Sequence, residues 1–349
     1  RGDHHIPPNA DILLMLRATL ANASRQGRRA GAARRSIASG VALRHVETIA
    51  SMSKEEILKV VTLAAEMKAN PEKYADALHQ KTLLMLFEKP SLRTRVSFET
   101  GMTQMGGHAI FYSIADSPLG KKESLSDTGI VLSRYADFIM ARVNKRTDIS
   151  ELCAVASVPV INALDDFAHP CQMLADLQTI VEQKGSCEGL KLSFFGDVAN
   201  NVTYDLMRLG SLVGMKIAVC GPIDQGKGYE VESQVIDECK ALGGDVVVTT
   251  NVQEAAEGSD VVYADSWMSY GIPDAEMDQR KAIFMPYQVN DEVMALTKSD
   301  SIFMNCLPAA RGLEQTAEVI DGPKSVVFDQ AENRMHAQKA LLHCLYYGF

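Results

Sequence analysis

The chain has 349 residues, which is long for a single hydrophobic core, so we expect two domains. Its formal charge of −9 at pH 7 argues against nucleic acid as a partner. A hydrophobic content of 46% is typical of soluble globular proteins, and no apolar run reaches the length of a membrane-spanning helix, so no membrane partner is expected.

Residues 1–43 differ in composition from the rest of the chain. They carry seven Arg, no Lys and two Asp, and no acidic residue lies between Met15 and Val46. A segment rich in Ala, Ser and Arg is typical of an organelle transit peptide, so we expect import into the mitochondrial matrix or a plastid and removal of the segment. Because the chain opens with Arg1 and this pattern begins at Met15, we expect that residues 1–14 do not belong to the natural precursor. An arbitrary basic tail is the alternative.

The first predicted domain spans residues 44–185. Ser53 and Glu56 have the spacing of a capping box and predict a helix to about Met67. The apolar run Thr82–Phe87 predicts a strand inside a parallel sheet covered on both faces. Further strands are predicted at 109–112, 138–141 and 158–162, with helices at 91–107, 124–135, 149–156 and 169–185.

The second predicted domain spans residues 186–331, and a final helix is predicted at 332–349. Its predicted strands are 192–195, 216–220, 245–249, 261–263, 302–304 and 326–328, and its helices are 201–213, 230–242 and 252–257. Strands that alternate with helices in both halves indicate the α/β class, with two domains that each contain a mostly parallel sheet flanked by helices.

The predicted helix after Thr82–Phe87 begins with features of an anion site. Ser91 is a good N-cap, and Arg93 and Arg95 follow it directly. Free backbone N–H groups, the positive end of the helix dipole and a guanidinium group together suit a phosphate-type dianion. A solvated basic turn is the alternative.

Polar residues also follow the other predicted strands, where ligands bind in open α/β sheets. The chain contains no GxxxxGK[ST], and the turn at 196–201 lacks the second and third glycines of GxGxxG, so neither a nucleoside triphosphatase nor a dinucleotide dehydrogenase is supported. The polar residues that follow the strands suit instead a cleft in which a phosphorylated electrophile reacts with an amine. These residues are Ser91, Arg93, Thr94, Arg95, Arg142, His169, Gln172, Asn200, Asn201, Asp265, Ser269, Asn305, Cys306 and Arg334.

Each of these residues also has a structural interpretation. His169 could cap a helix or lie at the edge of a core. Cys306 could be a small buried hydrophobic residue, and Asp265 could cap the next element. The seven cysteines include no CxxC pair, so we expect reduced thiols in an intracellular compartment and no structural metal.

Six segments, in this order, resemble the signatures of the aspartate/ornithine carbamoyltransferase superfamily, and of the ornithine carbamoyltransferases in particular. The resemblance covers residues 44–349. The segments are FEKPSLRTR (87–95), ARV (141–143), HPCQ (169–172), DSWMSYG (265–271), NCLP (305–308) and AENR (331–334).

The resemblance implies transfer of the carbamoyl group of carbamoyl phosphate to the δ-amine of L-ornithine, giving L-citrulline and phosphate. Ser91, Leu92, Arg93, Thr94, Arg142, His169, Gln172 and Arg334 resemble the carbamoyl phosphate contacts, with Thr94, His169 and Gln172 as hydrogen-bond donors. Asn201, Asp265, Ser269 and Tyr270 resemble the ornithine contacts. The catalytic residues implied are Arg142, His169, Asp265 and Cys306.

The resemblance also implies a homotrimer, a final helix that packs back on the first domain, and no metal or organic cofactor. It implies that a neighbouring subunit contributes a residue from the loop at 117–122, where Lys121 and Lys122 are candidates.

Three positions depart from the family pattern. Leu92 replaces a Thr of the first motif, Asn305 stands where ornithine carbamoyltransferases have His, and Tyr270 stands where they have Met. The last two lie on the side of the amino substrate, so a carbamoyltransferase for putrescine or an acylated ornithine is the alternative. A non-catalytic, anion-binding paralogue is a second alternative.

Overall fold

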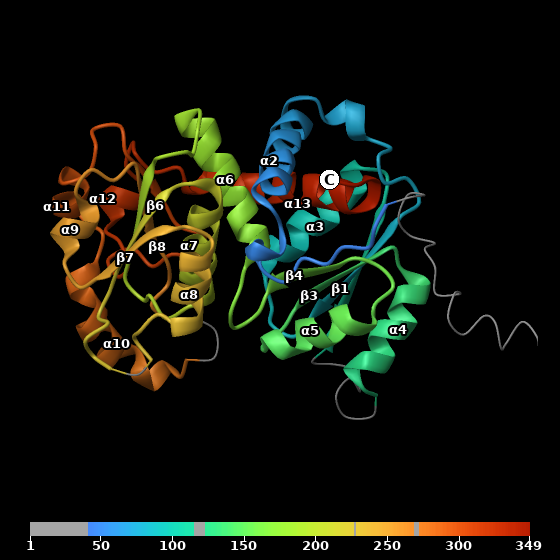
Figure 1. Cartoon of the computed structure of the whole chain (residues 1–349), viewed down its shortest axis with the longest axis horizontal. Helices are drawn as coiled ribbons and strands as arrows, with labels where there is room; N and C mark the ends of the chain where they lie inside the picture. Colours follow the sequence, from blue (N-terminus) through green and yellow to red (C-terminus); the bar gives the residue numbers. More distant parts are fainter. Residues whose placement is uncertain (1–40, 115–122, 227, 269–271) are drawn as a thin grey trace, which may run out of the picture. The chain divides into compact units, whose positions relative to one another are not determined.

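The computed structural model describes residues 41–114, 123–226, 228–268 and 272–349. Within these ranges the chain forms two parallel β-sheets, each flanked by helices (Figure 1). No helix in this part of the chain is both long enough and apolar enough to cross a membrane.

The first sheet has the strand order β2-β1-β3-β4, and all its pairings are parallel. The chain leaves β1 on one side to form β2 and on the other side to form β3, so the topological switch point lies between β1 and β3. The strands are β1 (Thr82–Phe87), β2 (His108–Ser113), β3 (Phe138–Arg142) and β4 (Val160–Leu164).

The second sheet has the order β7-β6-β5-β8-β9 and is also parallel throughout. Here the switch point lies between β5 and β8. The strands are β5 (Lys191–Phe195), β6 (Lys216–Cys220), β7 (Asp245–Thr249), β8 (Val261–Ala264) and β9 (Ile302–Met304).

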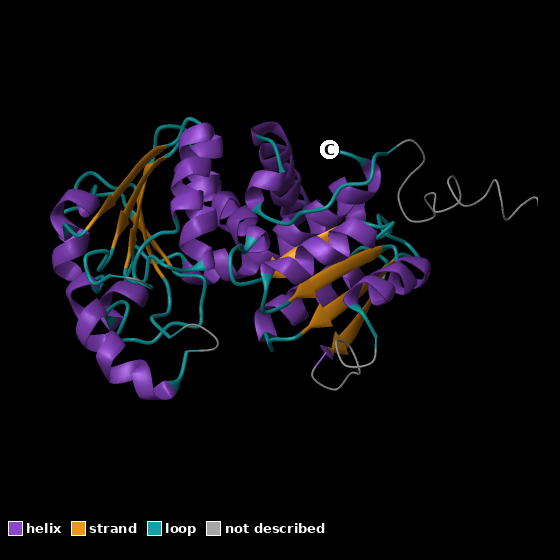
Figure 2. Cartoon of the chain, turned by 60° about the horizontal axis from the view of Figure 1, so that its bottom comes forward, coloured by secondary structure: helices purple, strands orange, loops and turns teal. Residues whose placement is uncertain are grey.

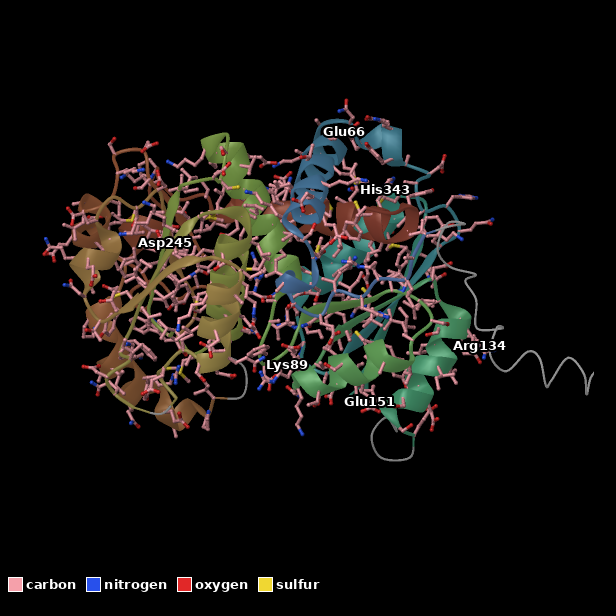
Figure 3. All side chains as sticks on the ribbon, in the orientation of Figure 1. Glu66, Lys89, Arg134, Glu151, Asp245 and His343 are labelled. Atoms are coloured by element: carbon pink, nitrogen blue, oxygen red, sulfur yellow. The ribbon has the colours of Figure 1, made fainter. Side chains whose placement is uncertain are left out.

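Helix α2 begins at the cap that the sequence predicts, whereas the helix predicted at 149–156 begins earlier, at Arg146. Ser53 and Glu56 form the capping box, since Glu56 N donates to Ser53 Oγ at 3.3 Å and Ser53 N donates to Glu56 Oε2 at 2.8 Å. Glu151, labelled in Figure 3, joins two helices because it accepts from both Ser126 N and Ser126 Oγ. The elements are η1 (Ile49–Ser51), α2 (Lys54–Ala69), η2 (Pro71–Tyr74), α3 (Leu92–Gln104), α4 (Leu125–Tyr135), α5 (Arg146–Val155) and α6 (Pro170–Lys184).

The second half contains several short helices that the sequence analysis did not predict. They lie between Asp274 and Ile320 and are too short for a helical hydrophobic period to stand out. The elements are α7 (Asn201–Val213), α8 (Ser233–Ala241), α9 (Val252–Ala256), η4 (Asp274–Glu276), α10 (Met277–Phe284), η5 (Met285–Tyr287), α11 (Asp291–Ala295) and α12 (Ala317–Ile320).

The last helix, α13 (Val327–Tyr347), corrects one prediction and confirms another. The predicted strand at 326–328 is wrong, and the helix begins at Val327 rather than Glu332. The apolar pair Val326 and Val327 resembles a strand, but Gln330 N donates to Val326 O at 2.9 Å and so starts the helix. As expected, α13 packs back on the first half, against α2, α3 and α6 (Figure 1). Figure 2 shows the helices that flank the strands of both sheets. The predicted fold class is confirmed.

The largest hydrophobic cluster runs through both halves, and each half also has a smaller cluster of its own. The largest cluster includes Met85 of β1 and Phe98 of α3, Leu174 of α6, and Leu206 of α7 with Phe194 of β5. Helix α6 is buried over almost its whole length, with every residue from Pro170 to Ile180 inaccessible. Helix α6 therefore packs in the hydrophobic interior of both halves.

Candidate active site

Several of the polar residues singled out in the sequence lie at the two topological switch points. In the first sheet, Arg142 ends β3 and pairs in register with Phe87, the last residue of β1. In the second sheet, Asn201 follows β5 and Asp265 follows β8. Open parallel sheets bind ligands at these points, because the loops there diverge and leave the strand ends accessible.

The N-terminus of α3 forms an anion-binding turn. Ser91 caps the helix, since its Oγ accepts from Thr94 N at 3.3 Å and donates to Thr94 Oγ1 at 3.0 Å. The Leu92 side chain is 76% exposed. The hydroxyl of the Thr that Leu92 replaces would therefore lie at an exposed position. Leu92 contributes only its backbone N–H to the turn. The first-turn amides and the helix dipole favour a bound phosphate.

Three guanidinium groups lie near enough to His169 for their charges to act on its ring. Arg142, Arg334 and His169 are buried, and Arg93 is half-buried. Burial, and then the charges of Arg334, Arg142 and Arg93, hold the pKa of His169 well below its ordinary value of 6.5. His169 is therefore neutral at physiological pH and has one ring N–H to donate. This concentration of positive charge suits a dianion.

His169 occupies the N-cap position of α6, but its side chain makes no capping hydrogen bond. The capping interpretation of the side chain is therefore wrong. Its backbone N–H donates to Asp205 Oδ2 at 2.8 Å, and Arg208 Nη1 donates to Asp205 Oδ1 at 2.9 Å. His169 Nδ1 is buried and has no hydrogen-bond partner among the described residues. Asp205 therefore fixes the backbone of His169, and the ring of His169 can still form a hydrogen bond to a ligand.

Arg334 of α13 joins the first half through two bonds. Its Nη1 donates to Gln172 Oε1 at 2.6 Å, and its Nη2 donates to Thr94 Oγ1 at 3.4 Å. Gln172 Nε2 donates to Asp176 Oδ1 at 2.7 Å. Asp176 therefore engages one of the two N–H groups of the Gln172 amide, and the expectation that Gln172 donates to the carbamoyl group stays a prediction. The Oε1 of Gln172 is an acceptor that also suits a carbamoyl NH₂.

Asp265 and Cys306 connect the ends of β8 and β9. Cys306 Sγ donates to Asp265 Oδ1 at 3.1 Å, and Ser266 N donates to the same oxygen at 2.8 Å. Burial raises the pKa of Asp265, while the Cys306 hydrogen bond and the charge of Arg93 oppose that shift. Burial and the neighbouring Asp265 raise the pKa of Cys306 well above 9, so Cys306 is a thiol and not a thiolate.

Asn201 links the second half to the loop that precedes His169. Its Nδ2 donates to Asp165 O at 2.6 Å, so its Oδ1 is the atom left to accept from an ammonium group. Ser269 and Tyr270, the other predicted ornithine contacts, lie outside the described residues, as do Lys121 and Lys122. Within the described ranges, no group of three or more His, Cys, Asp or Glu could hold a metal ion.

Asn305 is fully buried, and its side chain supports the loop that carries Cys306. Its Nδ2 donates to Gln315 Oε1 at 3.0 Å, its Oδ1 accepts from Leu307 N at 2.8 Å, and its backbone N–H donates to Gln330 Oε1 at 2.9 Å. This departure from the family pattern therefore changes the support of the loop, because both ends of its amide are bonded to the protein.

Sequence reasoning missed the residues that hold the site. Asp176, Asp205 and Gln330 are buried polar residues inside helices and follow no strand, so a search of strand ends passes over them. Asp176 did leave a signal, since a carboxylate within the apolar stretch of α6 must have hydrogen-bond donors facing it.

Comparison with known proteins agrees with this geometry. Residues 44–182 match the family described as the aspartate/ornithine carbamoyltransferase carbamoyl-P binding domain, and residues 188–345 match the Asp/Orn binding domain of the same family. An ornithine carbamoyltransferase of Halalkalibacterium halodurans is 48% identical over 314 residues, which cover 87% of this chain and 96% of that protein.

Solved structures share the fold over the same range. The ornithine carbamoyltransferase of Pyrococcus furiosus is 44% identical with a TM-score of 0.81, covering 86% of this chain and 96% of that one. A mitochondrial ornithine carbamoyltransferase of Coccidioides immitis is 35% identical with a TM-score of 0.78, covering 87% and 98%. The chain therefore belongs to the aspartate/ornithine carbamoyltransferase family.

Proposed function

We propose that this protein transfers the carbamoyl group of carbamoyl phosphate to the δ-amine of L-ornithine, giving L-citrulline and phosphate, as in arginine biosynthesis or the urea cycle. The observation that carries the proposal is the cluster of Arg142, His169 and Arg334 beside the capped N-terminus of α3. Relatives and structural neighbours named ornithine carbamoyltransferase support it.

The donor side of the site can bind and activate carbamoyl phosphate. The α3 amides, Arg93 and Arg142 bind the phosphate and stabilise the charge that grows on it as the C–O bond breaks. Neutral His169 donates a ring N–H to the carbamoyl oxygen and so polarises the carbonyl. Gln172 Oε1 accepts from the carbamoyl NH₂.

The acceptor side must bind an amine and allow it to lose a proton. The δ-amine of ornithine is mostly an ammonium at neutral pH and cannot attack in that form. Asp265 orients the amine and shares its proton, and the departing phosphate is the final acceptor. Asn201 Oδ1 accepts from the α-ammonium group. Holding both substrates together in this way removes much of the entropic cost of the reaction.

A panel of amines tests the acceptor. The purified protein is assayed with carbamoyl phosphate and, in turn, ornithine, putrescine, acetylornithine and aspartate, and carbamoylated product is measured. We expect turnover with ornithine. Turnover with putrescine or acetylornithine but not ornithine would overturn the acceptor, and no turnover with any amine would favour the non-catalytic paralogue.

We also propose that the active form is a homotrimer to which a neighbouring subunit contributes a residue from 117–122. The edge of the first sheet supports an interface, because β2 is an edge strand and exposes Ile110, and α3 beside it exposes Leu92 and Val96. Exposed apolar groups on a sheet edge are typical of contact surfaces. Ile110→Lys should reduce the mass measured by light scattering to that of the 38.1 kDa monomer, and an unchanged mass would contradict this surface.

We further propose that the protein is imported into an organelle. The Arg-rich, acid-poor segment at 1–43 supports import into the mitochondrial matrix or a plastid. Fusing residues 1–43, or residues 15–43, to a fluorescent protein tests this in cells. A diffuse cytosolic signal from both fusions would contradict import.

A further inference from the structure

The carboxylate of Asp176 is the centre of a buried hydrogen-bond network. It is fully buried, and three donors converge on it: Gln172 Nε2 at 2.7 Å, Gln330 Nε2 at 2.7 Å and Tyr263 O–H at 3.0 Å. These donors come from α6, α13 and β8. A buried carboxylate with three donors holds each of them in one orientation, since losing a bond would leave a buried polar group unsatisfied.

This network fixes which end of the Gln172 amide reaches the site. An ionised carboxylate only accepts hydrogen bonds, so the NH₂ of Gln172 must face Asp176. Arg334 only donates, so the oxygen of Gln172 must face Arg334, to which it bonds at 2.6 Å. If the Gln172 amide were rotated, its NH₂ would face the donors of Arg334 and its oxygen would face the carboxylate of Asp176.

We propose that Asp176 is a positioning residue for carbamoyl phosphate, which acts by keeping the oxygen of Gln172 turned toward the carbamoyl NH₂. The proposal rests on the proposed carbamoyl transfer. Asp176 touches no substrate. Its effect is to make the protein distinguish a carbamoyl group, which has an NH₂ to donate, from an acetyl group, which has a methyl group at the same place.

The Asp176→Leu substitution should release the Gln172 amide, because Leu has no oxygen to accept from Gln172 and only the bond from Arg334 still holds that amide. We expect the KM for carbamoyl phosphate to rise about 10- to 100-fold, while the inhibition constant of acetyl phosphate changes less than about threefold. Asp176→Asn is the conservative variant: its oxygen can take the place of Oδ1, which accepts from both Gln172 and Gln330, and its NH₂ can donate to the hydroxyl oxygen of Tyr263. The KM of Asp176→Asn should therefore stay within about threefold of the wild type.

A double substitution should restore the orientation. In Gln172→Glu with Asp176→Asn, the new Asn NH₂ donates to the new carboxylate, whose other oxygen faces Arg334 and the carbamoyl NH₂. We expect this variant to recover most of the preference for carbamoyl phosphate over acetyl phosphate that Asp176→Leu loses. It also keeps one negative charge beside Arg334, so it provides a test even if Asp176→Leu alone does not fold.

Thr179→Val is the matched control. Thr179 is also buried on α6, and its Oγ1 bonds Ala175 O at 2.8 Å and Asn333 Nδ2 at 2.9 Å, but it contacts no residue of the site. Its KM for carbamoyl phosphate should stay within about twofold of the wild type. All variants are assayed as the full chain with saturating ornithine, and circular dichroism checks their folding.

Several results would overturn the proposal. They are a wild-type KM in Asp176→Leu, equal weakening of carbamoyl and acetyl phosphate in that variant, an Asp176→Asn variant as impaired as Asp176→Leu, or a double variant that discriminates no better than Asp176→Leu. A failure of the proposed function is distinguishable, because the wild-type protein itself would then show no turnover.

Discussion

Asn305 and Gln315 hold each other by a hydrogen bond of 3.0 Å, and both side chains are fully buried. The same Asn305 amide accepts from Leu307 N, and Leu307 has a φ of 56°, in the left-handed region that branched side chains avoid. Such a backbone costs about 1–3 kcal/mol and persists only where the surroundings hold it. The pair therefore supports the backbone that presents Cys306.

Replacing Asn305 with Ala should weaken this support. Gln315 Oε1 and the Leu307 N–H would lose their partners, so we expect the free energy of unfolding to fall by about 1–3 kcal/mol. The KM for ornithine should rise, while the preference among amines should not change, because the Asn305 amide is bonded to the protein. Denaturant unfolding and the amine panel measure these effects.

A double-substitution cycle isolates the contact. Because Asn305→Ala and Gln315→Ala remove the same bond, their effects on stability should be less than additive. Gln234→Ala on α8 is a control, since its exposed amide bonds only Glu238. Additive losses would contradict the coupling of Asn305 and Gln315.

Arg142→Ala should abolish most activity. The substitution removes a buried guanidinium group at the switch point of the first sheet, so kcat/KM should fall by about 100- to 1,000-fold. Circular dichroism should show a folded protein. Lys240→Ala removes an exposed cation from α8 and should leave the kinetics near the wild type. Near-normal activity in Arg142→Ala would contradict the donor site.

His169 should remain neutral down to acidic pH. Its pKa is well below 6.5 in the folded protein and 6.5 in the unfolded chain, so the unfolded state binds more protons as the pH falls below that value. The stabilisation that comes from keeping His169 neutral is complete above pH 6.5 and is lost as the pH falls. His169→Gln should therefore lose less stability than the wild type between pH 7 and pH 5.

A spectroscopic measurement checks the same point. NMR of the ¹⁵N-labelled His ring of residue 169 should show no titration between pH 8 and pH 6. A midpoint near 6.5 would contradict the neutral form.

Cys306 should react slowly with iodoacetamide at pH 8, because its pKa lies well above 9 and only the thiolate is nucleophilic. Asp265→Asn removes a negative charge that raises this pKa, so alkylation of Cys306 should become faster. Mass spectrometry of the digested protein measures both sites at once, with Cys153 as an internal reference because its raised pKa does not involve Asp265. A slower reaction in Asp265→Asn would contradict the pairing.

Much of the fold followed from the sequence alone. The runs Thr82–Phe87, Lys216–Cys220 and Asp245–Thr249 are strands with the predicted bounds, and Asn201–Val213 is a helix with the predicted bounds. Each of these segments shows a single hydrophobic pattern, and the sequence marks clearly where that pattern begins and ends. The start of α13 was misread, because Val326 and Val327 look like a strand until the bond from Gln330 N to Val326 O is seen.

The candidate-site residues that directly follow strands could be predicted from the sequence. The residues that orient them through packing and hydrogen bonds were harder to predict. Arg142, His169 and Asp265 were found from their positions after strands. The direction of the Gln172 amide could not be predicted, because it depends on Asp176, a partner one helical turn away whose bonds become visible only in three dimensions.

The continuous core has a consequence for how the chain melts. Leu174 and Phe194 belong to one cluster with Met85, so if one half opened, the other would lose part of its hydrophobic interior and keep only its own smaller cluster. We expect the described part of the chain to unfold in one cooperative step. A ligand that contacts mainly the first half, such as carbamoyl phosphate, would then raise the melting temperature of both halves together.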